Sequence, residues 1–247
     1  MSKNLEDQDK IEQKCLDNVR SKLSRNVCYG VYDENYEELK KLLSDAKPNK
    51  NSSTFPDFLF ENGFIEHFAV TSSFENKKGS VQKLESCRLN KDSEKNFLKE
   101  LEDSEDGVVI NRSYTRLFEE HTHSNIVNSI QKNWKKHIIS YDNYSSSCKH
   151  GIFLIEYRDR NIQTAISRED EPADIFESYK ISADKYLLKW IYHYKNKIEY
   201  LIFINPISIE IIRLEQILEI IKNIPNVIFA PIIGMESLTY IGGKINK

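Results

Sequence analysis

Apolar residues at helical spacing predict two helices within the first 50 residues. Residues 5–25 carry apolar side chains at intervals that place them on one side of a helix, namely Leu5, Ile11, Cys15, Val19 and Leu23. The same spacing predicts a second helix over residues 35–46. Turn-forming residues follow this second helix and predict a loop before the next apolar run.

The segment from residue 55 to residue 73, FPDFLFENGFIEHFAVTSS, has an Asn-Gly pair between two apolar runs. Asn62 and Gly63 favour a two-residue turn, so the flanking runs are predicted to form a β-hairpin. The predicted register pairs Glu61 with Phe64, Leu59 with Glu66, and Asp57 with Phe68. Because side chains alternate between the faces of a strand, Asp57 and Glu66 share one face as diagonal neighbours, with backbones roughly 7–8 Å apart.

The rest of the chain is predicted to alternate helices with strands. Charged residues dominate 75–107 and indicate a loop, a helix and an exposed acidic turn. Helices are predicted at 113–139, at 181–196 with Ser182 as N-cap, and at 210–223; strands at 151–158, 199–205 and 226–233; an acidic loop at 168–174; and a frayed end at 242–247. The uninterrupted apolar run at 199–205 is typical of a strand buried on both faces.

This order of elements predicts a single α/β domain over residues 1–247. We expect a central mixed β-sheet, built from the hairpin and the three later strands, with helices flanking both faces. Residues 1–30 are expected to form an N-terminal helical arm, and residues 31–247 the core.

Composition narrows the class of protein. Apolar residues make up 39% of the chain and charged residues 30%, which is typical of a soluble globular protein. No apolar run is long enough for a membrane span, and the polar start predicts no signal peptide. The four cysteines lie far apart, so we expect reduced thiols and a cytoplasmic protein. Glycine-rich phosphate-binding loops are absent, and the net charge of −3 requires any nucleic-acid contact to use a local basic patch.

Two carboxylates on one face of a hairpin can bind a hard divalent cation such as Mg²⁺. The order of helix, loop, Pro56-Asp57 on one strand, Glu66 on the next, long helix and strand resembles the restriction-endonuclease-like PD-(D/E)xK nucleases over roughly residues 35–205. The resemblance implies that Asp57 and Glu66 bind Mg²⁺ or Mn²⁺. It further implies phosphodiester hydrolysis of DNA or RNA, which in a bacterium or phage suits restriction or antiviral defence.

The sequence departs from that family two residues after Glu66, where Phe68 stands in place of the expected lysine. We expect the missing charge to come from another segment, with Lys78 and Lys132 as first candidates and Lys77, Lys83 and Lys136 as alternatives. In some members of the family a glutamate of the helix before the hairpin also binds the metal, a role that falls to Glu38 or Glu37 here. Glu156, followed by Tyr157 and Arg158, is a competing acid at a strand end.

Several other polar residues have weaker claims to a function. Lys132, Lys135 and Lys136, together with Trp134 and His137, form the densest basic and aromatic cluster, and we expect the three lysines to contact nucleic-acid phosphates. His121 and His123 are predicted on a helix, where residues two apart do not face each other, so a metal role is disfavoured. His67 alternates away from Glu66 and is interpreted as a core histidine.

A second function class stays open. Without its lysine, the same fold would serve as a catalytically inactive binding or assembly subunit. The acidic stretches 99–106 and 168–174 would then be surfaces for a partner protein. The resemblance also implies that a homodimer is possible.

Overall fold

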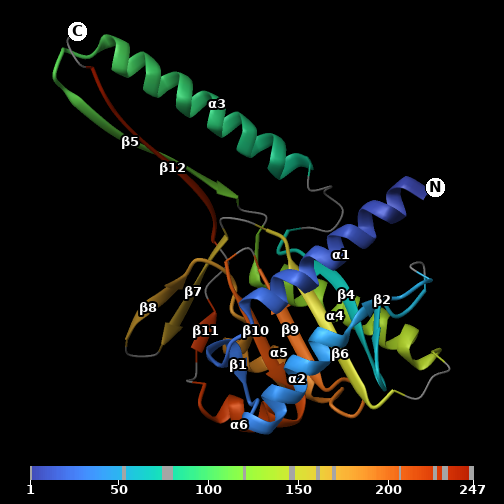
Figure 1. The fold of residues 1–247 in the computed structure, drawn as a ribbon. Coiled ribbons are helices and arrows are strands. Elements are labelled where there is room, and N and C mark those ends of the chain that lie inside the picture. The colour runs from blue at the N-terminus through green and yellow to red at the C-terminus, as the bar shows by residue number, and fades with distance from the viewer. Residues whose placement is uncertain are drawn as a thin grey trace.

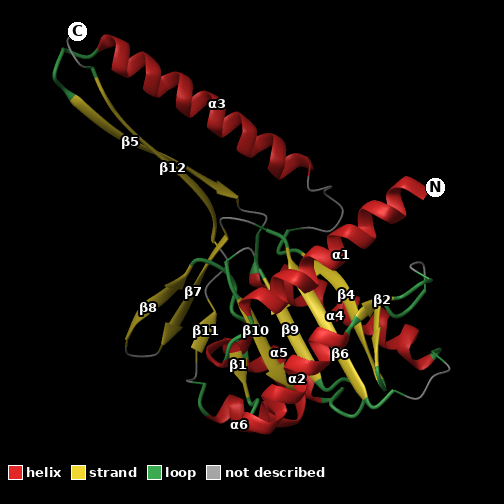
Figure 2. Ribbon diagram, viewed as in Figure 1, coloured by secondary structure: helices red, strands yellow, loops and turns green. Residues whose placement is uncertain are grey.

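The computed structural model describes residues 2–51, 54–73, 80–118, 121–144, 148–159, 162–168, 171–205, 207–224, 227–229 and 233–244. Its main feature is a seven-stranded mixed sheet covered by helices (Figures 1 and 2). The strands follow one another in the order β1 (Cys28–Tyr29), β10 (Ile209–Arg213), β9 (Tyr200–Ile204), β6 (His150–Tyr157), β4 (Gly63–Val70), β3 (Phe58–Phe60) and β2 (Lys47–Pro48). The expectation of a large mixed sheet flanked by helices is confirmed.

Strands β4, β6 and β9 run parallel to one another at the centre of this sheet. Their successive side chains enter two separate hydrophobic cores, because alternate residues of a strand face opposite sides. Ile152 and Leu154 of β6 pack into one core, and Phe153 and Ile155 pack into the other. The apolar run of β9 is buried along its whole length, as its sequence predicted.

Helices cover both faces of the sheet. On one face α1 (Ser2–Lys22) and α2 (Asp33–Asp45) bury Leu16, Val19, Leu39 and Leu43. On the other face α4 (His123–Asp142), α5 (Lys185–Tyr192) and α6 (Ile217–Lys222) bury Ile126, Trp134, Leu188 and Ile217. Short 3₁₀ turns lie at Arg25–Val27, Ile181–Ala183 and Leu214–Gln216. No helix of the described residues is long and apolar enough to cross a membrane.

A second, five-stranded sheet was not predicted. It contains β5 (Val109–Phe118), β7 (Ile162–Arg168), β8 (Glu171–Phe176), β11 (Val227–Phe229) and β12 (Ile233–Gly243). Strands β5 and β12 pair antiparallel over their length. Helix α3 (Ser80–Asp103) packs on them, and its Phe97 stacks on Tyr240 of β12 with 5.3 Å between ring centroids. Figure 1 shows α3, β5 and β12 as an arm that extends away from the main sheet.

Six local predictions were wrong, and long-range strand pairing or capping explains them. Residues 113–118 belong to β5, and the long helix begins only at His123, after the N-cap Thr122. Strand β10 replaces the start of the helix predicted at 210–223, and β8 overlaps the predicted acidic loop at 168–174. Strand β11 pairs with β7 and not with the central sheet. Gly242 and Gly243, predicted to begin a frayed end, are the last residues of β12. Asp184, not Ser182, caps α5 by accepting a hydrogen bond from the Leu187 N–H.

The hairpin of β3 and β4 forms, but its register differs by two residues from the prediction. Phe60 pairs with Gly63, so the loop is Glu61 and Asn62, and Asn62 has a positive φ of 59°. Continuing this register brings Asp57 directly opposite Glu66. A shift of two residues preserves the alternation along the strands, but the Asp57 carboxylate lies close to Glu12 of α1 and His67, whereas Glu66 Oε1 contacts His137 of α4 on the other face of the sheet.

Glycine is required at position 63 by close backbone approach. A Cβ atom there would lie 2.5 Å from the His150 carbonyl oxygen and 2.1 Å from Cε2 of Phe60. We expect Gly63→Ala to lower the free energy of unfolding by about 2–3 kcal/mol, at the upper end of overpacking costs, because the carbonyl of β6 cannot move aside. Urea denaturation measures this, with Glu61→Ala in the exposed turn as control. A loss below about 0.5 kcal/mol, the range of an ordinary surface change, would show that β4 and β6 are not held in this register.

Candidate metal-binding site

The carboxylates of Asp57 and Glu66 each accept a hydrogen bond from a backbone N–H at or next to the other acid. Glu66 Oε2 accepts from the Asp57 N–H at 3.2 Å, and Asp57 Oδ2 accepts from the His67 N–H at 2.7 Å. Asp57 comes just before β3, and Glu66 lies in the middle of β4 with its side chain buried. The turn at Asn62 therefore brings together two carboxylates that are nine positions apart in the chain.

A histidine of α4 completes the contacts of Glu66. His137 Nδ1 lies 2.5 Å from Glu66 Oε1, and the imidazole stacks on Phe68 with ring centroids 4.8 Å apart. Burial raises the pKa of Glu66 to about 8, whereas burial and the charge of Lys136 lower the pKa of His137 to about 4. Both shifts favour the uncharged forms of the two groups when no metal is bound.

Asp57 also carries a perturbed carboxyl group. Burial, followed by the charges of Glu66 and Glu12, raises the pKa of Asp57 to about 7. Within the described part of the chain, no lysine or arginine forms an ion pair with either Asp57 or Glu66. Buried carboxylates without a cationic partner gain stability from a bound cation.

Glu12 of α1 brings a third carboxylate to this place. The ligand atoms of Glu12, Asp57 and His67 all lie within 4.8 Å of one another, close enough to share one metal ion. Glu12 and Asp57 border a hollow of about 530 Å³ between α1 and the start of β3, whose lining includes Lys10, Lys14 and Asn49. Carboxylate oxygens suit Mg²⁺ and Mn²⁺.

The residues chosen from the sequence are only partly brought together. Asp57 and Glu66 meet, whereas Glu38 lies beside His150, with 3.8 Å from its Oε1 to Nε2. Lys77 and Lys78 lie outside the described residues. Lys132, Lys135 and Lys136 are exposed on α4, and the charge of Lys136 acts on Glu66 by lowering its pKa.

The other candidates have clear structural contacts. Arg158 donates from Nε to Glu156 Oε2 at 2.6 Å, and burial of Glu156 is outweighed by its interactions with His67 and Arg158, which lower its pKa. His123 contacts Asp184 at 2.7 Å. His121 is not helical, contrary to prediction, because it precedes the N-cap of α4, and its Nδ1 lies 2.6 Å from Ser72 Oγ.

No known protein family, curated protein or solved structure matches this chain. The interpretation of the site therefore depends on its geometry and chemistry.

Glu12 was not among the candidate site residues predicted from the sequence. The predicted apolar side of the first helix included Ile11, but Ile11 is 46% exposed in the structure. The buried positions are Glu12, Cys15, Leu16 and Val19, a spacing that places all four on one side of a helix. A glutamate in register with three apolar residues was the available signal, because a carboxylate on a buried helix side needs a partner.

Proposed function

We propose that the protein is a Mg²⁺- or Mn²⁺-dependent nuclease that hydrolyses phosphodiester bonds in DNA or RNA. The observation that carries this proposal is the convergence of Glu12 and Asp57, with His67 close to both, beside a hollow whose lining includes Lys10 and Lys14, while Glu66 accepts a hydrogen bond from the Asp57 N–H. Structural carboxylates are normally neutralised by nearby cationic side chains, whereas this group is suited to a metal ion.

The arrangement of elements supports a restriction-endonuclease-like core. Helix α2 is followed by β2, β3 and β4 as an antiparallel series; α3 and β5 then intervene before α4 and β6, and β6 runs parallel to β4. Glu66 lies on β4 and Asp57 directly precedes the neighbouring strand β3, which supports the resemblance. In bacteria such a nuclease would act in restriction or antiviral defence.

Each group has a defined task in this mechanism. Glu12 and Asp57 supply oxygen ligands, and the hollow leaves room for water and a phosphate on the open side of the site. Glu12 and Asp57 would hold Mg²⁺ or Mn²⁺, which would polarise the scissile phosphate and lower the pKa of the attacking water. Glu66 and His137 hold an exchangeable proton next to the reacting centre. His137 stacks on Phe68, so an imidazole stands next to the position where the resembled family has lysine.

Incubation of the full chain with linear double-stranded DNA, single-stranded DNA and RNA, in Mn²⁺, Mg²⁺ or EDTA, tests the proposal. Cleavage in metal that EDTA abolishes is the expected result. Absence of cleavage in every metal and on every substrate would favour the second candidate function.

That second candidate is a catalytically inactive subunit that binds nucleic acid or a partner protein. The reciprocal backbone hydrogen bonds of Asp57 and Glu66 favour it, because they give both acids a structural task. In that case, replacement of either acid would destabilise the hairpin and leave metal binding unchanged.

The lysines of α4 give a binding prediction. Replacing Lys132, Lys135 and Lys136 with Gln is expected to weaken nucleic-acid binding and to lower the slope of log K against log salt by about 2–3, because each phosphate contact releases roughly one counterion. The core of α4 is untouched, since Ile130, Trp134 and Ile138 face inward. Fluorescence anisotropy at several salt concentrations measures the slope.

The matched control replaces Lys91, Lys95 and Lys99 with Gln. These three lysines are exposed on α3, on the arm away from the acids, and the change in net charge is the same. An equal loss of affinity in both triple variants would mean that α4 acts only through the overall charge of the protein.

A further inference from the structure

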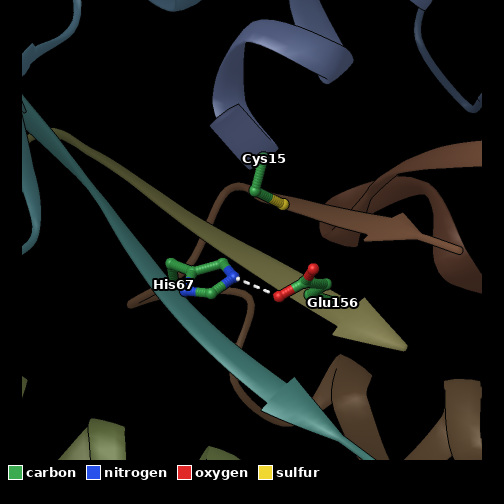
Figure 3. A group of neighbouring side chains, drawn as sticks. All are labelled: Cys15, His67 and Glu156. Atoms are coloured by element: carbon green, nitrogen blue, oxygen red, sulfur yellow. Dashed lines mark ion pairs between the residues drawn. The ribbon is translucent and has the colours of Figure 1, made fainter. Parts of the chain in front are cut away.

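A second group of potential metal ligands lies in the interface between α1 and the central sheet. Cys15 of α1, His67 of β4 and Glu156 of β6 each present one ligand atom, and these atoms lie within 4.8 Å of one another. Figure 3 shows the three side chains converging from a helix and two parallel strands. A thiolate, an imidazole and a carboxylate form a ligand set typical of zinc, in contrast to the oxygen-rich group around Asp57.

His67 supplies the second observation. Its side chain is 4% exposed, and its Nε2 atom has no hydrogen-bond partner among the described residues. Glu156 Oε2 lies 3.3 Å from that nitrogen, close enough for electrostatic attraction but without hydrogen-bond geometry. Figure 3 shows this buried ring nitrogen directed at the Glu156 carboxylate, with the Cys15 thiol nearby, so the ion pair with Glu156 is its one printed contact and a metal ion between the three groups would satisfy it.

We propose that Cys15, His67 and Glu156 bind one Zn²⁺ ion, which fastens α1 to β4 and β6. Coordination exchanges the thiol proton of Cys15 for the metal and releases that proton to solvent. Arg158, whose side chain is half-exposed, already donates to Glu156 Oε2 and acts as the outer partner that ligating carboxylates usually have. A fourth ligand, water, completes the tetrahedral shell.

The zinc ion has a consequence for the neighbouring site. Glu12 precedes Cys15 by three residues, so both side chains lie on the same side of α1. A metal bond at Cys15 therefore fixes the helix in the rotation that directs Glu12 toward Asp57. His67 lies within reach of both ligand groups, so in this proposal His67 binds zinc and the Mg²⁺ or Mn²⁺ of the nuclease site is left to Glu12 and Asp57. The zinc proposal does not require the nuclease activity, because a structural ion that anchors α1 would serve an inactive binding protein equally well.

The test uses the full chain, stripped of metal and then reconstituted with Zn²⁺ or Co²⁺. Elemental analysis after desalting is expected to give one zinc per chain, and the Co²⁺ form is expected to show a thiolate-to-metal charge-transfer band. Cys15→Ser, His67→Gln and Glu156→Gln are each expected to weaken Zn²⁺ binding by at least about 100-fold, since loss of a ligand exceeds the cost of losing an outer partner. Cys28→Ser is the matched control and is expected to bind like the wild type.

Three variants on three different elements keep the test decisive if one of them fails to fold, which circular dichroism reveals. The proposal is overturned if the wild-type protein holds no zinc after reconstitution. It is also overturned if folded Cys15→Ser and His67→Gln bind Zn²⁺ as tightly as the wild type does. Because no step of this test measures cleavage, a failed nuclease assay leaves its result unaffected.

Discussion

Asp57→Asn is expected to lower metal-dependent cleavage by at least about 100-fold. The amide keeps the size of the side chain but loses the charge that binds the cation, and loss of a direct ligand costs more than the 10–100-fold typical of an outer partner. The backbone of β4 keeps its hydrogen bond, because the oxygen of the substituted amide side chain still accepts from the His67 N–H. Initial rates at saturating Mn²⁺ measure the effect.

Glu66→Gln and Glu12→Gln are expected to lose activity in the same assay. Glu61→Gln is the control, since Glu61 lies in the exposed turn of the same hairpin, away from the two acids and from the hollow beside Asp57. Cleavage by Asp57→Asn at more than about a tenth of the wild-type rate, a tenfold effect equal to only about 1.4 kcal/mol, would exclude Asp57 as a metal ligand.

In metal-free buffer the folded protein is expected to lose stability as the pH rises from about 4 to about 8. Burial raises the pKa of Asp57 to about 7 and of Glu66 to about 8, above the ordinary values that the unfolded chain has. The folded state therefore binds more protons than the unfolded state in this window. Its extra stability is complete below the unfolded pKa values and is lost as the pH rises through the folded ones.

The size of this effect is several kcal/mol, at about 1.4 kcal/mol for each unit of pKa difference. Urea denaturation at a series of pH values measures it. Asp57→Asn and Glu66→Gln are expected to give flatter profiles than the wild type, and Glu61→Gln an unchanged one. A wild-type stability that increases steadily from pH 5 to pH 8 without metal would contradict the burial of these two acids.

The hairpin shows what a local pattern can and cannot predict. Asn62 and Gly63 identified the turn and the proximity of the two acids. The register was two residues out because Gly63 is needed inside β4, where the His150 carbonyl of β6 approaches too closely for a side chain. His150 is 87 residues away in the chain, so no local rule for hairpin turns contains that contact.

The second sheet was missed for a related reason. Strand β5 pairs with β12 more than 100 residues later, and the paired positions include Ser113 with Thr239 and Thr115 with Ser237. These small polar residues lack the apolar alternation by which strands are recognised. The short apolar run of β10 is equally compatible with a buried helix, and its pairing with β9 decides between the two.

The candidate site was predicted as a pair and found as a larger group. Asp57 and Glu66 followed from alternation along the hairpin. Glu12 and His137 come from helices on opposite faces of the sheet, and only the packing of α1 and α4 brings them to the acids. Long-range assembly of this kind leaves little trace in sequence beyond a charged residue at a buried helical position.

Thermal unfolding with and without Mn²⁺ tests the central claim, metal binding at Asp57, without knowledge of the substrate. A ligand that binds only the native state stabilises it by about 2.7 kcal/mol at 100 times its Kd, which corresponds to a rise in Tm of about 5 °C or more for a chain of this size. The wild type and Cys15→Ser are expected to show this rise at pH 8, and Asp57→Asn is expected to show none. A wild-type Tm that does not respond to millimolar Mn²⁺, or an equal response in Asp57→Asn, would contradict a metal site at these carboxylates.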